Sequence, residues 1–430
     1  MDVQITPGPL TGTIEAISSK SELHRMLICA AFADRPTEIR VSGSAYDGSH
    51  ELPNDILATL GCLNALGTRS QILPGTIRII PAVKNIAGKI PLLDCGESGS
   101  TFRFLLPVAA AFCGEADFRG SGRLPKRPIG ELADALKSHG VTFTSDTLPF
   151  RISGKPAGGI YEIPGNISSQ YLTGLLLMLP LLEEETEIHL TTALASTGYV
   201  NITSRVMEAF GIQVLQKNNY WTLAKSRRYK SPEHIAAGGD WSNSAAFLTA
   251  SMLREQNDIV CQSLKEDSPQ GDRKLLGFLE DFGADIAITA NGISASANAL
   301  HGTAIDIDET PDLLPYLAVA ACAADGRTDF FNAGRLRLKE SDRIESTAAM
   351  VRALGGNAET DEERLIIHGT GSLTGGIVDS ANDHRIVMAA AIAASICKTP
   401  VIIQGAEAVN KSYPTFFEDF KTLKGVCHVL

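Results

Sequence analysis

A repeat of roughly 72 residues runs through the chain of 430 residues and constrains its fold more than any other feature. Glycines that end a helical stretch recur at Gly67, Gly140, Gly211, Gly283 and Gly355. Their successive spacings are 73, 71, 72 and 72 residues, and the segment KTLKG, ending at Gly425, adds a sixth match. Glycine suits the left-handed residue that closes a helix. The period therefore predicts six copies of one structural unit.

A second series precedes these helices, in which a polar turn opens into a helix rich in Ala and Leu. Its copies begin at Ser18, Gly96, Gly165, Gly239, Asp308 and Ala381. Alternating strand-like residues with a turn follow each glycine. The unit therefore reads strand, buried helix, strand, amphipathic helix, strand, strand. Six such units predict an α/β protein with mixed sheets.

The last unit lacks its final strands unless the N-terminal segment 1–17 supplies one, which would close the ring of repeats. If three repeats form a domain, residues 1–17 and 237–430 make one domain and residues 18–236 make the other. Two chain crossings then join the domains and form a natural hinge. We expect the active site in the cleft between the domains and expect a ligand to close them.

Composition excludes several classes of protein. The 38 Lys and Arg against 49 Asp and Glu give a net charge of -11, which argues against a general nucleic-acid or membrane binder. The 8 cysteines form no C-x-x-C pair, so a reduced, cytoplasmic setting is expected. The first residues, MDVQITPGPL, have no basic or apolar region, so no signal segment is expected, and the apolar runs 172–182 and 386–397 are shorter than the roughly 20 residues of a membrane span.

Polar turns before apolar helices place free N–H groups and a positive helix end together, which favours an anion. Candidate ligands at the turns of the first half are Lys20, Ser21, Arg25, Gly99, Ser100, Arg103, Arg127, Ser168, Ser169 and Gln170. Helix capping and solvated cations are the alternative reading for most of them. Capping explains one of the three adjacent donors at 168–170, but not all three.

The second half carries further charges. The segment L-R-L-K-E-S-D-R-I contains Arg335, Arg337, Lys339, Glu340, Asp342 and Arg343, and such a run is usually a solvated, ion-paired helix face. N-D-H-R, with Asp383, His384 and Arg385, opens the most Ala-rich helix, where polar groups must be paired or face a cleft. Lys411 precedes a turn, and Asp312 in T-P-D-L-L-P is either a helix-start acid or a base.

The Lys and Arg residues of these segments come from both halves of an otherwise acidic chain. Together they indicate a doubly anionic ligand. No metal-ligand series is present, so no metal is expected. There is also no G-x-x-x-x-G-K-[ST] or G-x-S-x-G motif for nucleotide hydrolysis or a hydrolase.

In order, the motifs S-K-S-E-L-H-R, G-x-S-G-S-x-x-R-F, K-R-P, S-S-Q, L-K-E-S-D-R and N-D-H-R resemble those of the 5-enolpyruvylshikimate-3-phosphate synthases. The resemblance covers nearly the whole chain. It implies an inside-out α/β barrel of two domains with three repeats each, closing over shikimate 3-phosphate and phosphoenolpyruvate. It implies no cofactor, no metal and no macromolecular partner, and we expect a monomer.

The resemblance also implies roles for single residues. Shikimate 3-phosphate would be bound by Lys20, Ser21, Arg25, Ser168, Ser169, Gln170, Ser196, Asp312 and Lys339, with Tyr199 beside its pocket. Phosphoenolpyruvate would be bound by Lys20, Gly99, Arg127, Gln170, Arg343, Arg385 and Lys411. Asp312 would act as the base at the shikimate 5-hydroxyl, with Glu340 and Lys20 near C3 of the enolpyruvate.

Some positions depart from the family pattern. Glu97 and Arg335 each stand where Asn is common, and Ser100 and Phe104 replace a common Thr and Pro. The sister family, the UDP-N-acetylglucosamine enolpyruvyl transferases, usually has Cys in the loop before its R-P, and G-S-G-R-L-P-K-R-P has none. A non-catalytic nucleic-acid clamp is a third hypothesis, but it would need basic residues along an inner face rather than at helix starts.

Overall fold

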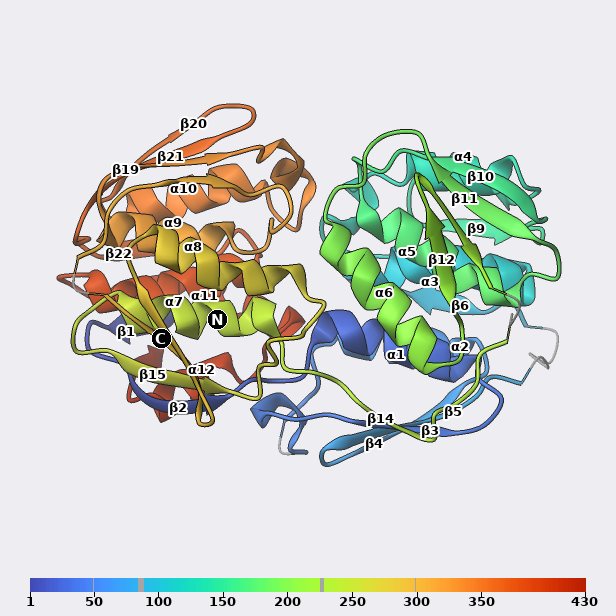
Figure 1. Ribbon diagram of the computed structural model, residues 1–430, viewed down its shortest axis with the longest axis horizontal. Helices are drawn as coiled ribbons and strands as arrows, with labels where there is room; N and C mark the ends of the chain where they lie inside the picture. Colours follow the sequence, from blue (N-terminus) through green and yellow to red (C-terminus); the bar gives the residue numbers. More distant parts are fainter. Residues whose placement is uncertain (49, 84–88, 225–227, 298) are drawn as a thin grey trace. The chain divides into compact units, whose positions relative to one another are not determined.

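The computed structural model describes residues 1–48, 50–83, 89–224, 228–297 and 299–430, which form two compact units (Figure 1). Unit 1 comprises Met1–Ile17, Ser42–Glu51 and Gly238–Leu430, and unit 2 comprises Ser18–Val41 and Leu52–Ala237. The segment Ser42–Glu51 thus lies with unit 1, whereas the division drawn from the sequence places it within 18–236. It is held there by Ser44, whose hydroxyl donates to Asp419 at 2.5 Å.

The described residues contain six four-stranded sheets of one topology. In each sheet the first strand of a repeat runs parallel to the second, and the remaining two pair antiparallel. The sheets of unit 2 comprise β14 (His234–Ala236), β3 (Thr37–Arg40), β5 (Thr76–Ile80) and β4 (Arg69–Leu73); β6 (Leu92–Asp94), β7 (Glu115–Arg119), β9 (Phe150–Ser153) and β8 (Thr142–Phe143); and β10 (Gly159–Ile163), β11 (Thr186–Leu190), β13 (Tyr220–Leu223) and β12 (Val214–Lys217).

The sheets of unit 1 follow the same order. They comprise β2 (Thr11–Glu15), β15 (Asp258–Gln262), β17 (Gly292–Ser296) and β16 (Asp285–Thr289); β18 (Ala304–Asp306), β19 (Asp325–Phe331), β21 (Leu365–Thr370) and β20 (Asn357–Thr360); and β22 (Gly376–Asp379), β23 (Val401–Gln404), β1 (Val3–Thr6) and β24 (Val426–Val429). The mixed α/β architecture predicted from the period is confirmed.

The N-terminal strand completes the last repeat. β1 lies between β23 and β24 and pairs antiparallel with both, from Val3 opposite Ile403 and Val429. The expectation that segment 1–17 supplies the missing strand is therefore confirmed. β2 and β14 likewise serve as first strands of the fourth and first repeats, because each pairs parallel with the second strand of a repeat distant in sequence.

Each repeat contributes one buried and one amphipathic helix. The buried helices are α1 (Lys20–Ala31), α3 (Gly99–Cys113), α5 (Ser169–Met178), α7 (Trp241–Met252), α9 (Leu314–Ala323) and α11 (His384–Ala393). The amphipathic helices are α2 (Asn54–Ala65), α4 (Gly130–Lys137), α6 (Thr197–Ala209), α8 (Leu275–Asp281), α10 (Arg343–Ala353) and α12 (Phe416–Thr422). Within unit 1, α7, α9 and α11 pack on one another, and sheets cover them on opposite sides (Figure 1). Small residues such as Ala allow this close packing of helices and sheets.

Helix ends follow the predicted period with one correction. Gly67, Gly140, Gly211, Gly283 and Gly355 all have a positive φ, between 76° and 97°. In the sixth repeat Lys424, with φ 64°, takes this position instead of Gly425. The amide that follows donates to the carbonyl five residues earlier in both cases, as in Thr68 to Leu63 and Gly425 to Phe420. The backbone closure is therefore kept although the glycine is displaced by one residue.

No helix in the described parts of the chain is both long and apolar enough to cross a membrane.

Candidate active site

The starts of the three buried helices in unit 2 gather polar side chains. Ser19, Ser98 and Ser168 precede α1, α3 and α5, and each side chain accepts from an amide of its own helix. Lys20 at the start of α1 forms an ion pair with Asp55 of α2, with 2.6 Å between Nζ and Oδ2. Capping explains Ser168 as the sequence allowed, whereas α1 is capped by Ser19 and not by Ser21, which lies within the helix.

Arg25 is a buried cation held by neutral oxygens. Its Nε donates to Thr203 at 2.7 Å, and its terminal nitrogens donate to the carbonyls of Ser21 (2.6 Å) and Tyr199 (3.0 Å). The guanidinium carbon lies 4.8 Å from the centre of the Phe104 ring. Burial lowers the pKa of Arg25 to about 10, so it stays charged at neutral pH. An anion is the ligand that such a cation favours.

Gln170 is fixed in orientation by two neighbours from α3. Its Oε1 accepts from Arg103 at 2.6 Å, and its Nε2 donates to Ser100 at 3.1 Å. Arg103 also donates to the carbonyl of Pro128 at 3.0 Å. The sequence marks Arg103 as a helix-start cation, but only the structure shows that it ties α3, α5 and the K-R-P turn together.

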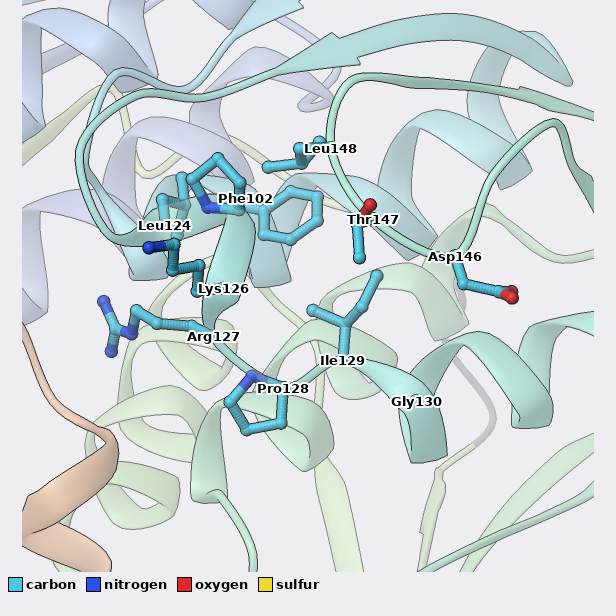
Figure 2. Close-up of a pocket in the computed structure, with 11 residues that line it drawn as sticks. Phe102, Leu124, Lys126, Arg127, Pro128, Ile129, Gly130, Asp146, Thr147 and Leu148 are labelled. Atoms are coloured by element: carbon cyan, nitrogen blue, oxygen red, sulfur yellow. The ribbon is translucent and has the colours of Figure 1, made fainter.

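Arg127 lies over the start of α3. A methyl group added to Gly99 would lie 2.5 Å from Nη1 of Arg127 and 2.9 Å from its guanidinium carbon. Arg127 follows the short helix η2 (Leu124–Lys126) and lines one edge of a cavity of about 240 Å³. Figure 2 shows its guanidinium directed away from Phe102 and Leu148, which form the apolar part of that cavity. Gly99 is therefore the residue that leaves room for this cation.

Two further positions in unit 2, Ser196 and Glu97, have unusual backbone surroundings. Ser196 is 3% exposed and adopts a left-handed conformation (φ 56°) directly before α6. The Glu97 carboxyl lies against the backbone of Gly122, where an added methyl group would be 2.5 Å from Cδ. Glu97, a departure from the family pattern, thus points toward the loop before K-R-P.

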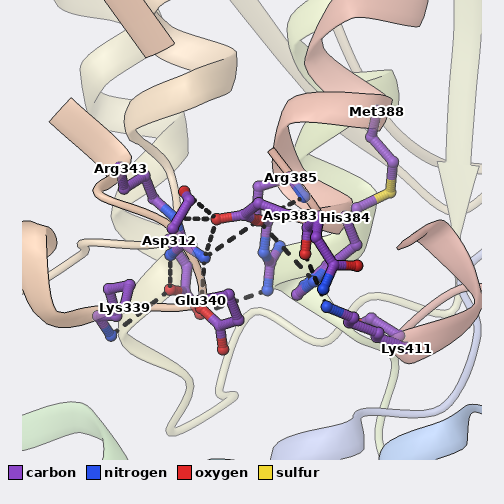
Figure 3. A network of polar contacts seen from close by, with 12 residues as sticks. Asp312, Lys339, Glu340, Arg343, Asp383, His384, Arg385, Met388 and Lys411 are labelled. Atoms are coloured by element: carbon purple, nitrogen blue, oxygen red, sulfur yellow. Dashed lines mark hydrogen bonds and ion pairs between the residues drawn. The ribbon is translucent and has the colours of Figure 1, made fainter. Parts of the chain in front are cut away.

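Unit 1 holds a dense cluster of charges, which we define as Asp312, Lys339, Glu340, Arg343, Asp383 and Arg385 (Figure 3). At its centre is Arg343, the first residue of α10, whose side chain is 1% exposed. It donates to Asp312 at 2.6 Å and to Glu340 at 2.7 Å, and its Nε donates to Asp383 at 3.0 Å. One arginine thus joins the segments before α9, α10 and α11.

Asp312 lies where the cations converge. Its Oδ2 accepts from Arg385 at 3.3 Å, and its Oδ1 lies 3.7 Å from Nζ of Lys339. Burial would raise the pKa of Asp312, but Lys339, Arg385 and Arg343 outweigh it and hold the pKa well below its ordinary value. Burial in turn lowers the pKa of Lys339. Asp312 is therefore an ionised carboxylate, and the alternative of a simple helix-start acid does not explain its three cationic neighbours.

Arg385 is oriented by groups from three elements. Its Nη1 donates to the carbonyl of Ser242 at 2.6 Å and to the Tyr316 hydroxyl at 3.3 Å, and its amide donates to Asp383 at 2.9 Å. Its side chain is 3% exposed. Burial opposes its charge, but Tyr316 and Asp312 leave the pKa well above its ordinary value. A preorganised cation of this kind can stabilise charge that develops on a substrate.

Lys411 ends the short helix η7 (Ala406–Lys411) and is 8% exposed. Its Nζ donates to the carbonyl of Asn382 at 2.6 Å. Asn382 directly precedes Asp383, so Lys411 lies beside the N-D-H-R turn.

The structure separates the charged run of residues 335–343 into two parts. Arg335 pairs with Asp308, 2.8 Å from Nε to Oδ1, and Arg337 pairs with Asp342 at 2.8 Å. These two fit the ion-paired surface reading, whereas Arg343 does not. Sequence reasoning also missed Asp272, which is 4% exposed and whose pKa burial raises to about 6. An isolated Asp in G-D-R-K carries no signal of such burial.

The predicted residues thus fall into two groups. Unit 2 contains Lys20, Ser21, Arg25, Gly99, Arg127, Ser168, Ser169, Gln170 and Ser196, and unit 1 contains Asp312, Lys339, Glu340, Arg343, Arg385 and Lys411. Among the described residues, no three His, Cys, Asp or Glu side chains are grouped so that they could hold a metal ion.

The six repeats in two units define the class of this protein, an inside-out α/β barrel enzyme. The chain belongs to the EPSP synthase (3-phosphoshikimate 1-carboxyvinyltransferase) family, whose model matches residues 5–420. It is a transferase of the shikimate pathway, which leads to the aromatic amino acids.

Relatives and solved structures agree. The chain is 37% identical to the 3-phosphoshikimate 1-carboxyvinyltransferase of Clostridium kluyveri over 98% of this chain and 97% of that protein. It is also 37% identical to the enzyme of that name from Clostridioides difficile, with the same coverage of both. The EPSP synthase structure from Acinetobacter baumannii covers 100% of both chains with a TM-score of 0.80 and 25% identity.

Proposed function

We propose that this chain transfers the enolpyruvyl group of phosphoenolpyruvate to the 5-hydroxyl of shikimate 3-phosphate and releases phosphate. The observation that carries the proposal is Asp312, an ionised carboxylate in contact with the buried cations Arg343 and Arg385. Such a pairing supplies both functions that the reaction needs, because the cations suit an anionic substrate and the carboxylate suits a hydroxyl proton.

In the proposed reaction the 5-hydroxyl oxygen bonds to C2 of the enolpyruvate while its proton passes to Asp312. C3 gains a proton from Glu340 or Lys20, which gives a tetrahedral intermediate. The bond from C2 to the phosphate oxygen then breaks as C3 returns its proton, and the double bond forms again. Atoms and charges balance without a cofactor, and fixing two substrates together supplies much of the rate.

Each unit contributes groups to both substrates in this proposal. Shikimate 3-phosphate is bound by Ser21, Arg25, Ser168, Ser169, Gln170 and Ser196 of unit 2 and by Asp312 and Lys339 of unit 1. Phosphoenolpyruvate is bound by Lys20, Gly99, Arg127 and Gln170 of unit 2 and by Arg343, Arg385 and Lys411 of unit 1. The buried, neutral-oxygen-bound guanidinium of Arg25 supports a phosphate ligand there.

The function is tested by measuring phosphate release from phosphoenolpyruvate with each of two acceptors. We expect release with shikimate 3-phosphate and none with UDP-N-acetylglucosamine. Calorimetry should also show binding of shikimate 3-phosphate to the protein alone. Release only with the nucleotide sugar would instead favour the sister transferase, and no binding or release with either would overturn the proposal.

We further propose that the enzyme works as a monomer in the cytoplasm. Support comes from its 8 free cysteines, seven of them buried, which suit a reducing compartment. Sedimentation equilibrium tests the monomer, and a mass of twice 45.8 kDa would contradict it.

Gly99→Ala should raise the KM for phosphoenolpyruvate about 10- to 100-fold, because the methyl group displaces the Arg127 guanidinium from the start of α3. Arg127→Ala should raise the KM by a similar factor, and the double variant should raise it no further, since both changes remove one contact. Steady-state kinetics measures all three.

The matched control is Gly61→Ala in α2, where an added methyl group meets no atom within 4 Å. It should leave the KM unchanged. If the double variant raises the KM by the product of the factors of the two single variants, Gly99 and Arg127 act separately.

A further inference from the structure

The turn between β22 and α11 adopts a backbone that L-residues rarely take. Ala381 and Asn382 are consecutive non-glycine residues with φ values of 50° and 54°. Both lie in the left-handed region, where a Cβ atom crowds the backbone. A surrounding that holds two such residues in place is a reason to look for function at the turn.

Two side chains that directly precede the turn hold this conformation. The Ala381 amide donates to Asp379 at 2.8 Å, and the Asn382 amide donates to the Ser380 hydroxyl at 3.3 Å. The Ser380 hydroxyl in turn donates to the carbonyl of Gly405 at 3.0 Å. Ser380 is 2% exposed, so the two bonds of its hydroxyl are shielded from water.

Gly405 connects the turn to the helix that carries Lys411. It directly precedes η7 and has a φ of 67°. A methyl group added to Gly405 would lie 2.7 Å from the Ser380 hydroxyl. The two segments are therefore in close contact, and a shift of the turn moves the start of η7.

The same turn contacts the ammonium group of Lys411 and leads into α11, whose second residue is Arg385. The carbonyl of Asn382 accepts from Nζ of Lys411 at 2.6 Å. The next residue, Asp383, caps the N-terminus of α11, and its side chain accepts from the backbone N–H of Arg385 at 2.9 Å. An ammonium group has three N–H donors, so the carbonyl fixes the direction of the two that remain.

We propose that the Ser380 hydroxyl and the Asn382 carbonyl form a clamp that sets the position of Lys411 relative to Arg385. Both are positioning residues, and they act on the anionic groups of phosphoenolpyruvate through these two cations. The inference rests on the proposed function, since it assigns the clamp to the phosphoenolpyruvate side of that reaction.

Ser380→Ala should raise the KM for phosphoenolpyruvate about 3- to 10-fold, because it removes both bonds of the hydroxyl. The kcat and the KM for shikimate 3-phosphate should change much less. Asn382→Gly keeps both the left-handed φ and the carbonyl, whereas Asn382→Val disfavours that φ. The valine variant should therefore raise the KM more than the glycine variant, and equal effects of the two would contradict the clamp.

The matched control is Ser395→Ala. Ser395 is 4% exposed and donates to the carbonyl of Ile392 at 2.7 Å, so it loses a buried hydroxyl bond of the same kind away from the turn. It should not change the KM for phosphoenolpyruvate. A rise equal to that of Ser380→Ala would mean that general loosening of unit 1 causes the effect.

A double variant tests whether the clamp acts through Lys411. In a Lys411→Ala background, Ser380→Ala should raise the KM no further. If the KM of the double variant instead rises by the product of the two single-variant factors, Ser380 does not act through Lys411 and the proposal is overturned.

Failure of the proposed function is distinguishable from failure of the clamp. If the wild-type protein does not use the two substrates, the KM cannot be measured for any of the variants. The clamp is then judged by urea unfolding of the Ser380→Ala, Lys411→Met and double variants. Non-additive shifts of the midpoint support the clamp, and additive shifts overturn it.

Discussion

Asp312→Asn should lower kcat at least about a hundredfold while shikimate 3-phosphate still binds, because the amide keeps the shape of the side chain but cannot take the hydroxyl proton. Asp312 lies beside Arg343 and Arg385, the cations that we propose bind phosphoenolpyruvate. Rapid-quench measurement of a single turnover separates the chemical step from binding.

The depressed pKa of Asp312 gives the prediction a pH dependence. A carboxyl whose pKa is held below its ordinary value is deprotonated above that value, so Asp312 should limit kcat/KM only in strong acid. A carboxylate this acidic is also a weak base. An anionic substrate that shares Arg343 and Arg385 with Asp312 weakens both ion pairs and raises the pKa toward that of a working base. Binding of the anionic substrate would thus raise the basicity of Asp312, the base that the reaction needs.

Asp329→Asn is the matched control. The Asp329 side chain is 21% exposed, as is that of Asp312, and it pairs with Arg327 at 3.1 Å and Arg364 at 3.5 Å. Its loss removes a comparable carboxylate from the surface of unit 1 and should leave kcat within a fewfold of the wild type. Near-normal turnover in Asp312→Asn would return Asp312 to the role of a helix-start acid.

The architecture could be predicted from the sequence because the period repeats local signals six times. Each helix-ending residue must adopt a left-handed φ, and glycine does so without strain, as Gly67 and Gly355 show. The rule failed by one residue at the sixth copy, where Lys424 adopts that φ. The pattern of residue types thus identifies the repeat, while the backbone alone shows which residue closes it.

The candidate site could be predicted only in part. Motifs mark residues close to one another in sequence, such as Lys339 and Arg343, but their partners come from distant segments. Arg25 bonds Thr203, which is 178 residues away. The run of residues 335–343 shows the limit most clearly, because charge alone does not distinguish a surface arginine from a buried one. Burial separates them, since the Arg343 side chain is 1% exposed and the Arg337 side chain 28%.

This difference leads to a prediction about stability. Arg343→Met should lower the free energy of unfolding of unit 1 by about 3 to 5 kcal/mol, because it leaves the fully buried Asp383 without its arginine partner. Arg337→Met is the matched control from the same run. It removes partly exposed ion pairs to Asp342 and Glu345 and should cost no more than about 1 kcal/mol.

The chain has 2 tryptophans, Trp221 in unit 2 and Trp241 in unit 1, so a Trp221→Phe background lets fluorescence follow unit 1 during urea unfolding.

The pH dependence of the stability of unit 1 follows from Asp312. Its depressed pKa gives stability that is present above the unfolded pKa of about 3.9 and is lost as pH falls through the folded value. The cost of Arg343→Met should therefore be constant between about pH 5 and 8 and shrink in acid. Equal costs for Arg343→Met and Arg337→Met at neutral pH would mean that the buried arginine neutralises no more charge than the exposed one, and the cluster would then be an ordinary surface ion-pair network.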